Sequence, residues 1–327
     1  MEQDKEILLD VHGLKKYFPI KNSPFSGGLD SVKAVDGVDM FIRRSETLGL
    51  VGESGCGKST LSRLILRLIE PTEGQVFYNG TDILALEKRK MRNMRKNMQL
   101  IFQDPFSSLD PRMPIGRTIG EPLEFFRLVK NKSEKKERVA QLLTNVGLDE
   151  DYAKRYPHEF SGGQRQRISI ARALASSPQL VICDEPVSAL DVSVRSQVLN
   201  LMQDLQDQFN LTYLFITHDL SVAEFISDRM AVMYLGRMVE IAEKSEFYQN
   251  PLHPYTKALL SAVPQPDPDT KKNRIILSGD VPTPINPPSG CTFHPRCKYA
   301  TDICKEAKPQ LTDVGGSHFV SCHLYIK

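Results

Sequence analysis

The first candidate for chemistry is a glycine-rich loop. Residues 52–59 read Gly-Glu-Ser-Gly-Cys-Gly-Lys-Ser and match the phosphate-binding pattern G-x-x-x-x-G-K-[ST]. In such a loop backbone N–H groups converge on phosphate oxygens, Lys58 reaches the β- and γ-phosphates, and the Ser59 hydroxyl binds Mg²⁺. A glycine turn that merely caps a helix is the alternative. Because residues 47–51 predict a buried strand and residues 60–68 an amphipathic helix, the context favours a nucleotide site.

A pair of carboxylates is the second candidate. Residues 180–183 are an unbroken apolar run that ends in Asp184 and Glu185. Such a run predicts a buried parallel strand, and α/β folds bind ligands at the carboxyl ends of these strands. Asp184 is suited to hold Mg²⁺, and Glu185 to act as the base on an attacking water. The alternative is that the two acids are simply solvated. The phosphate loop earlier in the chain makes this the weaker explanation.

Three further polar residues end or cap predicted elements. Gln103 follows a predicted strand at 98–102, where its amide can contact a metal and a partner protein. His218 follows a predicted strand at 213–217 and is either structural or a sensor of the γ-phosphate. Ser161 predicts the N-cap of a helix whose first-turn N–H groups can bind an anion, or are simply a polar first turn. Each of these signals is weak on its own.

An aromatic pair follows the first predicted strand, residues 7–14. Tyr17 and Phe18 lie upstream of the phosphate loop, and either ring can stack on a purine base. Ordinary packing at the end of a strand explains the pair equally well.

Composition limits the classes of function. The 42 Lys and Arg against 40 Asp and Glu leave a net charge of +2, which gives no global attraction to nucleic acid. Six basic residues lie within 88–96, and we interpret them as a solvated helical face rather than an anionic-lipid or nucleic-acid patch. No window approaches about 18 uninterrupted apolar residues, and the charged N-terminus lacks a signal-peptide core. The 327 residues therefore suit a cytoplasmic α/β domain with an appendage.

The C-terminal segment is rich in cysteine. Prolines between residues 264 and 288 predict a linker without a long helix or central strand. Four of the six cysteines follow it, at Cys291, Cys297, Cys304 and Cys322. A cytoplasmic protein is not expected to join them as disulfides, and their spacing lacks the close Cys pair of zinc sites. Iron–sulfur clusters accept four thiolates at varied spacings. Zinc held with His294, His318 or His323 is a rival, and free thiols are the third interpretation.

Taken in order, these motifs resemble the ATPase subunit of an ABC transporter over residues 7–241. The phosphate loop, Gln103, the signature Phe160-Ser-Gly-Gly-Gln164, the carboxylate pair, the loop 188–191 and His218 all match. Phe160 replaces the commoner leucine of the signature. GTPases, adenylate kinases and helicases carry no Ser-Gly-Gly-Gln before the carboxylate strand. The resemblance implies an α/β P-loop NTPase fold, the ABC nucleotide-binding domain, with a mixed core sheet over residues 1–262 and a helical subdomain at about 104–176. A small Cys-rich appendage would occupy 263–327.

The resemblance also implies roles for individual residues. Glu185 would be the catalytic base, His218 would orient the γ-phosphate and water, and Gln103 would assist catalysis and join Ser59 and Asp184 on Mg²⁺. Residues implied in ATP binding are Gly52, Glu53, Ser54, Gly55, Cys56, Gly57, Lys58, Ser59, Thr60 and an adenine-stacking Phe18 or Tyr17. ATP bound on a facing ATPase would be contacted by Ser161, Gly162, Gly163, Gln164 and Asp191.

Finer features resemble the oligopeptide/dipeptide/nickel importer group. These features are the segments 102–111, 184–191 and 253–261 and the cysteine-rich tail. Such importers usually use two ATPases, and residues 52–57 and 64–71 favour the second of them, the F-type. The implied partners are a paralogous D-type ATPase in a heterodimer, two transmembrane permease subunits and an extracytoplasmic solute-binding protein. The implied location is peripheral, on the cytoplasmic face of the cell membrane. Some members hold a 4Fe–4S cluster in the tail, on Cys291, Cys297, Cys304 and Cys322 here.

The expected function is therefore ATP hydrolysis that powers peptide import. An importer of nickel or another small solute is the nearer alternative. A soluble ABC-type ATPase acting on DNA or ribosomes is the more distant one, because such proteins usually carry two fused cassettes or long coiled-coil insertions.

Overall fold

The computed structural model describes residues 6–20, 31–104, 108–263 and 274–325. The chain divides into two units. Unit 1 consists of Met1–Glu6, Arg43–Thr47 and Ala85–Ile216. Unit 2 consists of Ile7–Ile42, Leu48–Leu84 and Thr217–Lys327. Both units are therefore assembled from segments that lie far apart in the sequence.

The strands of unit 1 form a parallel ladder. They are β6 (Met98–Ile101), β7 (Leu180–Asp184) and β8 (Thr212–Ile216), hydrogen-bonded in that order. Every residue of β7 and β8 is buried, so their sequences are apolar without alternation, as strands covered on both faces require. The expected strands at 98–102, 180–185 and 213–217 are confirmed to within one residue at each end.

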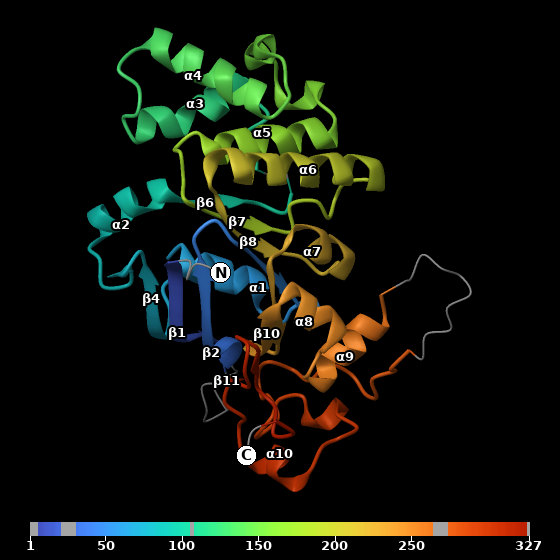
Figure 1. The fold of residues 1–327 in the computed structure, drawn as a ribbon. Helices are drawn as coiled ribbons and strands as arrows, with labels where there is room; N and C mark the ends of the chain where they lie inside the picture. The colour runs from blue at the N-terminus through green and yellow to red at the C-terminus, as the bar shows by residue number, and fades with distance from the viewer. Residues whose placement is uncertain (1–5, 21–30, 105–107, 264–273, 326–327) are drawn as a thin grey trace. The chain divides into compact units, whose positions relative to one another are not determined.

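Helices make up most of the rest of unit 1. They are α2 (Lys88–Met94), α3 (Ile115–Phe125), α4 (Lys132–Asn145), α5 (Gly162–Leu174) and α6 (Val192–Phe209). Short 3₁₀ helices span Arg95–Asn97, Glu150–Lys154 and Pro157–Glu159. Figure 1 shows α3, α4 and α5 stacked together, with α6 alongside α5. The sequence predicts a polar helix over residues 130–143, a helix opened by Ser161 and a helix with an apolar face over 194–209, and all three are confirmed.

Four prolines between residues 105 and 122 predict an irregular stretch of chain, and this prediction is wrong from residue 115 onward. Helix α3 begins at Ile115 and includes Pro122. Ile115, Ile119 and Leu123 are fully buried at helical spacing, so a continuous apolar stripe outweighs the proline. Part of the expected irregular stretch, residues 105–107, lies outside the described residues.

Unit 2 contains an antiparallel sheet and a mixed set of strands. The first sheet has the order β2-β1-β4-β5, from β2 (Ser31–Arg43), β1 (Ile7–Pro19), β4 (Glu73–Tyr78) and β5 (Thr81–Asp82). In the second set β3 (Thr47–Val51) pairs in parallel with β9 (Arg229–Tyr234). Then follow, all antiparallel, β10 (Arg237–Glu243), β12 (Phe319–Val320) and β11 (Thr312–Asp313). Parallel and antiparallel pairs in one set make this sheet mixed, as expected.

The helices of unit 2 are short. They are α1 (Lys58–Ile65), α7 (Leu220–Ile226), α8 (Lys244–Gln249), α9 (Pro254–Ser261), the 3₁₀ helix η4 (His294–Arg296) and α10 (Asp302–Glu306). Residues 274–288 form no helix or strand, as their prolines predict. The remainder of that linker, residues 264–273, lies outside the described residues.

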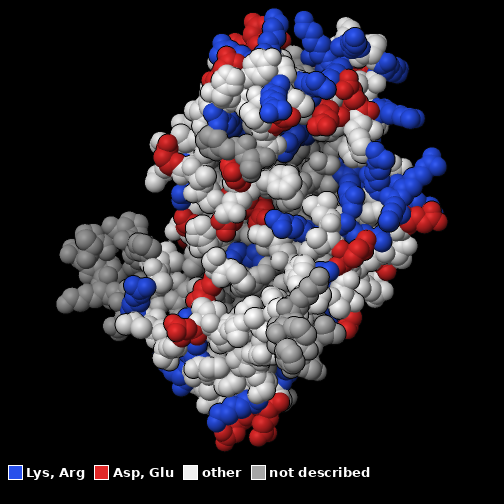
Figure 2. All heavy atoms as spheres, turned by 180° about the vertical axis from the view of Figure 1, so that it is seen from behind, with Lys and Arg blue, Asp and Glu red and all other residues white. Residues whose placement is uncertain are grey.

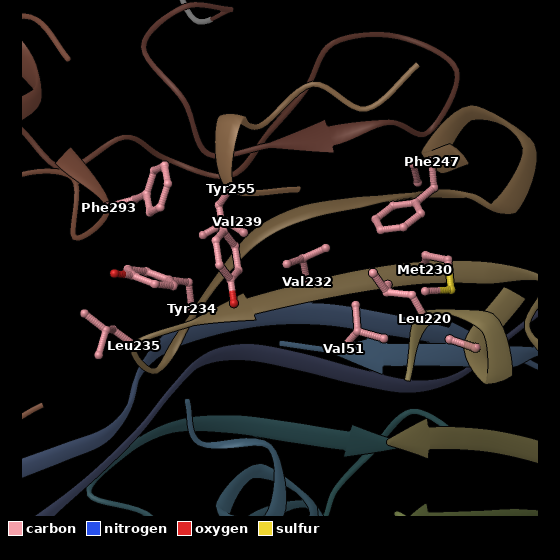
Figure 3. Packing of buried hydrophobic residues seen from close by; sticks show 12 residues of the cluster. Val51, Leu220, Met230, Val232, Tyr234, Leu235, Val239, Phe247, Tyr255 and Phe293 are labelled. Carbon is pink, nitrogen blue, oxygen red and sulfur yellow. The ribbon is translucent and has the colours of Figure 1, made fainter. Parts of the chain in front are cut away.

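The C-terminal segment is part of unit 2, and the expectation of a separate appendage finds no support. Strand β12 extends the sheet beside β10, with Val320 opposite Glu240. Phe293 is 1% exposed and packs edge-on against Tyr234, with Tyr255 next to both (Figure 3). Burying a side chain of this size stabilises a fold by about 1.5–3 kcal/mol. The tail therefore contributes both a strand and a core side chain.

A buried carboxylate joins three segments of unit 2. Glu240 accepts hydrogen bonds from the backbone N–H groups of Leu252 (2.7 Å) and His253 (2.8 Å), and its other neighbour is His318 Nε2 (2.8 Å). Burial lowers the pKa of His253 to about 4, so the ring is neutral. Its Nδ1 then accepts from Tyr255 N–H and caps α9. Strand β10, helix α9 and the tail are thus tied at one point.

The surface of unit 1 carries the basic run of the sequence. Helix α2 buries Met91 and exposes Lys88, Arg89, Lys90 and Arg92. Figure 2 shows Lys and Arg side chains gathered at the right edge, where α2 lies. Within the ranges that the structure describes, no helix is long and apolar enough to cross a membrane.

Candidate nucleotide site

The glycine-rich loop of unit 2 connects β3 to α1 by a backbone that only glycine allows. Gly52 has φ 154° and Gly57 has φ 109°. A Cβ on Gly52 would lie 2.2 Å from Met233 O, and one on Gly57 would lie 2.1 Å from Ala34 O. The loop therefore presses against neighbouring backbone at both ends. Its last glycine leads directly into the first turn of α1, whose positive end favours phosphate.

Lys58 turns into the loop. Its Nζ donates to Gly52 O (2.7 Å) and Glu53 O (3.1 Å), and the residue is 6% exposed. The carbonyl groups hold the ammonium where phosphate oxygens, which are stronger charged acceptors, can compete for it.

Cys56 lies beside the same ammonium. Its Sγ is 3.6 Å from Lys58 Nζ. Burial raises the pKa of the Cys56 thiol, although the Lys58 charge opposes the change. The thiol is therefore protonated near neutral pH. Because the thiolate is the reactive form, this protects Cys56 from oxidation, which would obstruct ATP binding in the loop.

The aromatic pair upstream of the loop is placed by a buried ion pair. Tyr17 Oη donates to Asp36 Oδ1 (2.5 Å), and Arg237 donates to Asp36 Oδ2 through Nε (3.0 Å) and Nη2 (2.5 Å). Burial acts in the opposite direction, but the hydrogen bonds from Tyr17 and Arg237 hold the pKa of the Asp36 carboxyl below its usual range. Tyr17 is thus fixed in orientation, whereas the adjacent Phe18 is 38% exposed, with Lys16 Nζ 5.1 Å from its ring centre.

His218 is exposed, and the residue before it, Thr217, is hydrogen-bonded to strand β3, which enters the phosphate loop. Thr217 N–H donates to Leu50 O at 3.2 Å, next to the end of β3. Asp219 then caps α7 by accepting from Ser221 N–H (3.0 Å). These contacts place His218 beside the strand that enters the phosphate loop.

In unit 1 the structure brings Gln103 and Glu185 together. Gln103 Nε2 donates to Glu185 Oε2 at 2.9 Å. Glu185 has φ 50°, a left-handed conformation that a non-glycine residue rarely adopts. Its N–H donates to Ile216 O at 2.9 Å, which supports the turn at the end of β7. Asp184, the preceding residue, stays buried at 7% exposure. Such strain at a strand end is typical of functional sites.

The signature segment forms a capped helix start in unit 1. Ser161 Oγ accepts from Gln164 N–H (3.4 Å), and Gln164 Oε1 accepts from Ser161 N–H (3.0 Å). This reciprocal pair is a capping box and confirms Ser161 as the N-cap of α5. A Cβ on Gly163 would lie 2.3 Å from Val194 Cγ1, so the glycine allows the start of α5 to approach α6.

Asp191 caps the neighbouring helix. Its Oδ1 accepts from Val194 N–H at 3.0 Å, at the first turn of α6. Because Gly163 lies against Val194, the two capped helix starts are adjacent. Ser161 and Asp191 are both exposed, so these turns are open to another molecule.

Sequence reasoning missed two residues at the phosphate loop. Arg296 Nη1 donates to both carboxylate oxygens of Glu53, at 3.3 and 3.0 Å, and its Nη2 donates to Oε1 at 3.3 Å. Glu53 N–H also donates to Tyr255 Oη at 3.0 Å. Arg296 belongs to no motif, and Tyr255 was noted only within a segment of the importer group.

The tail cysteines lie near one another without forming a metal site. Burial raises the pKa of Cys291, Cys297 and Cys322, the last to about 11, and neighbouring cysteines raise each further. Cys291 N–H donates to Cys304 O at 2.8 Å. Throughout the described part of the chain, which includes all four, no group of three or more His, Cys, Asp or Glu side chains is arranged to hold a metal ion. The thiols are close, but they are not a ready ligand set.

Comparison with known proteins decides the family. The model of the ABC transporter family matches residues 35–188, and that of the oligopeptide/dipeptide transporter C-terminal region matches residues 239–304. The chain is 55% identical over 325 residues to the oligopeptide transport ATP-binding protein AppF of Bacillus subtilis, covering 98% of each chain. It belongs to the oligopeptide ABC transporter ATP-binding proteins. A putative peptide import ATP-binding protein of Brucella ovis is 52% identical over 315 residues, covering 96% of this chain and 97% of the relative.

Solved structures place this ABC ATP-binding protein in the expected fold. The ATP-binding cassette MJ0796, in a dimeric post-hydrolysis state bound to ADP and Pi, superposes with a TM-score of 0.63 at 28% identity. That match covers 72% of this chain and 98% of the cassette. The ABC transporter component cbiO1 of Clostridium perfringens gives a TM-score of 0.64 at 25% identity, covering 75% and 92%. The fold class is therefore the ABC nucleotide-binding domain with its mixed α/β sheet.

Proposed function

We propose that this ATP-binding protein hydrolyses ATP to power the uptake of oligopeptides through an ABC permease. The observation that carries the proposal is similarity to an oligopeptide transport ATP-binding protein along almost the whole chain. The match to the transporter C-terminal region, residues 239–304, supports it separately, because that range does not overlap the ABC transporter match at residues 35–188.

We propose the following roles for residues of the nucleotide site. Residues 52–60 bind the phosphates of ATP, with Lys58 as the cation, and Tyr17 or Phe18 stacks on the adenine. Ser59, Gln103 and Asp184 hold Mg²⁺, which neutralises charge on the phosphate oxygens. Glu185 is the general base, kept in position by the amide of Gln103. His218 orients the γ-phosphate and the attacking water.

The proposed assembly is a pair of ATPases under a membrane permease. The helical subdomain, about residues 104–176, presents Ser161, Gly162, Gly163 and Gln164 to ATP bound on the partner, and Asp191 joins that contact. The two exposed, capped helix starts suit such a face. The partners are a paralogous D-type ATPase, two permease subunits and an extracytoplasmic solute-binding protein. The chain then works peripherally, at the cytoplasmic face of the membrane.

Reconstitution tests the function. We expect the complex purified through a tag on this chain, placed in liposomes, to hydrolyse ATP faster when peptide-loaded solute-binding protein is present and to accumulate labelled peptide. The matched control is the same binding protein without peptide. Accumulation of nickel instead of peptide would replace the proposal with the metal-import alternative. Recovery of the chain with ribosomes or DNA and without permeases would replace it with a soluble ATPase.

We propose that residues 263–327 are a Pro-rich linker followed by a metal-binding segment, in which Cys291, Cys297, Cys304 and Cys322 bind a 4Fe–4S cluster. Support comes from four thiols that lie close enough to influence one another's pKa. Because their present arrangement is no metal site, binding would require the sulfur atoms to move together. The cluster would be structural, since no other residue singled out in the chain suggests electron transfer.

The cluster has a direct test. Protein purified without oxygen should be brown and contain about four iron atoms per chain, as a cubane cluster requires. Cys297→Ser should lose the colour and the iron. Cys183→Ser should keep both, because Cys183 is buried in β7 and far from the tail in sequence. A colourless preparation with stoichiometric zinc, or with no metal, contradicts the cluster.

A further inference from the structure

Two residues from the C-terminal half of unit 2 hold Glu53, the second residue of the phosphate loop. Arg296 approaches both carboxylate oxygens, and Tyr255 Oη accepts from the Glu53 N–H. The ion pair is shielded, since the Arg296 side chain is 9% exposed and that of Glu53 is 28% exposed. Both the side chain and the backbone of this loop residue are therefore fixed by groups more than 200 positions away, at sequence separations of 243 and 202.

Arg296 follows a residue that is packed into the core of unit 2. It ends η4, which starts after Phe293. Phe293 packs against Tyr255 (5.4 Å between ring centres), Tyr234 (5.3 Å) and His253 (5.5 Å). Figure 3 shows the side chains of Phe293, Tyr234 and Tyr255 as neighbours in this cluster. Because Tyr255 belongs to the same ring cluster, both contacts to Glu53 come from segments that pack against each other.

The negative charge of Glu53 gives the contact with Arg296 an effect on nucleotide binding. A carboxylate in a loop that receives a polyphosphate repels it, and partial burial weakens the screening of that repulsion by salt. A guanidinium that approaches both carboxylate oxygens neutralises the charge and fixes its direction at the same time. A lysine would supply the charge without the planar geometry.

The C-terminal segment also lies close to the proposed adenine-stacking residue Tyr17, through Lys308 and Asp36. Lys308 Nζ lies 3.9 Å from Asp36 Oδ2, and Asp36 accepts the hydrogen bond from Tyr17 Oη. The C-terminal segment therefore contacts two carboxylates. One is Glu53 in the phosphate loop, and the other is Asp36, which orients Tyr17 of the proposed adenine-stacking pair. The Lys308 contact is the longer and weaker of the two.

We propose that Arg296 is a positioning residue for ATP: it neutralises Glu53 and holds the phosphate loop in its binding conformation. The inference rests on the proposed function only in assuming that this loop binds ATP. It assigns a role to the C-terminal segment in nucleotide affinity, separate from any role of the cysteines.

The test uses the full chain and compares ATP binding with turnover. Arg296→Met is expected to raise KM and the Kd for MgATP about tenfold, a size typical of coupling between sites, with kcat changed less than about twofold. Arg296→Lys should fall between Arg296→Met and the parent. Lys305→Met is the matched control, because Lys305 lies in the same segment and pairs with Asp302 at the surface (2.9 Å). It should leave both constants unchanged.

A double variant separates electrostatics from simple loss of structure. Adding Glu53→Gln to Arg296→Met removes the unpaired carboxylate and should return KM to within about threefold of the parent, a non-additive result expected of contacting residues. Additive effects, or an unchanged KM in Arg296→Met, would overturn the inference. A misfolded Arg296→Met cannot be rescued by Glu53→Gln, so that outcome also counts against it. If the parent chain itself binds no MgATP, the proposed function fails instead.

Discussion

Replacing Glu185 with glutamine should slow ATP hydrolysis by at least about 10²-fold, the loss typical of a missing general base. ATP should still bind, because the substitution does not touch the phosphate loop. In the structure Gln103 Nε2 donates to Glu185 Oε2 at 2.9 Å. The amide oxygen of Glu185→Gln can accept the same hydrogen bond, so the geometry at the end of β7 persists while the basic carboxylate is lost. The variant should also accumulate as a closed ATPase dimer, since its γ-phosphate is not cleaved.

Single-turnover hydrolysis and equilibrium binding of MgATP measure the two effects separately. Glu137→Gln is the matched control, because it removes the same charge from an exposed position on α4. It should hydrolyse ATP at the parent rate. If Glu185→Gln also does so, another group is the base.

Much of the architecture follows from patterns local in sequence. Four of the five buried residues of strand β7 are apolar, so hydropathy predicts the existence of the strand and its position to within one residue. The N-cap of α5 is a Ser followed three residues later by Gln, and the structure contains both hydrogen bonds of that box. The phosphate loop requires glycines at positions where a Cβ would meet backbone oxygen. In each case a short stretch contains the whole physical reason.

The features that sequence did not predict depend on contacts between distant segments. Arg296 meets Glu53 across 243 positions, and nothing around Arg296 distinguishes it from any other arginine. Helix α3 forms despite Pro122, because its apolar stripe is buried by α4 and α5. The tail joins unit 2 through Phe293 and the short strand β12, neither of which has a local signal strong enough to predict. Packing, which is not periodic in sequence, decides all three.

The contact between Gln103 and Glu185 is an intermediate case. The sequence places Gln103 after a predicted strand and Glu185 at the carboxyl end of a predicted parallel strand, and β6 and β7 are neighbours in the sheet. The hydrogen bond forms with Glu185 in a left-handed backbone conformation, and no residue preference predicts that conformation.

Lys58→Ala should weaken MgATP binding by about 10²-fold or more, because hydrogen bonds to charged groups contribute about 1.5–3 kcal/mol each and the ammonium can make more than one to phosphate. Its Nζ donates to Gly52 O and Glu53 O in the structure, so the variant also leaves these carbonyls without that donor. The fold should survive, because the buried side chains of α1 that pack in the core are Leu61, Leu64 and Ile65.

Calorimetric titration with MgATP, together with the thermal unfolding midpoint, distinguishes lost binding from lost structure. Lys90→Ala is the matched control, since Lys90 is an exposed lysine on α2. It should bind MgATP like the parent chain. Parent-like affinity in Lys58→Ala would mean that the ammonium stays on the loop carbonyls when nucleotide binds. The backbone N–H groups and the start of α1 would then supply the phosphate contacts by themselves.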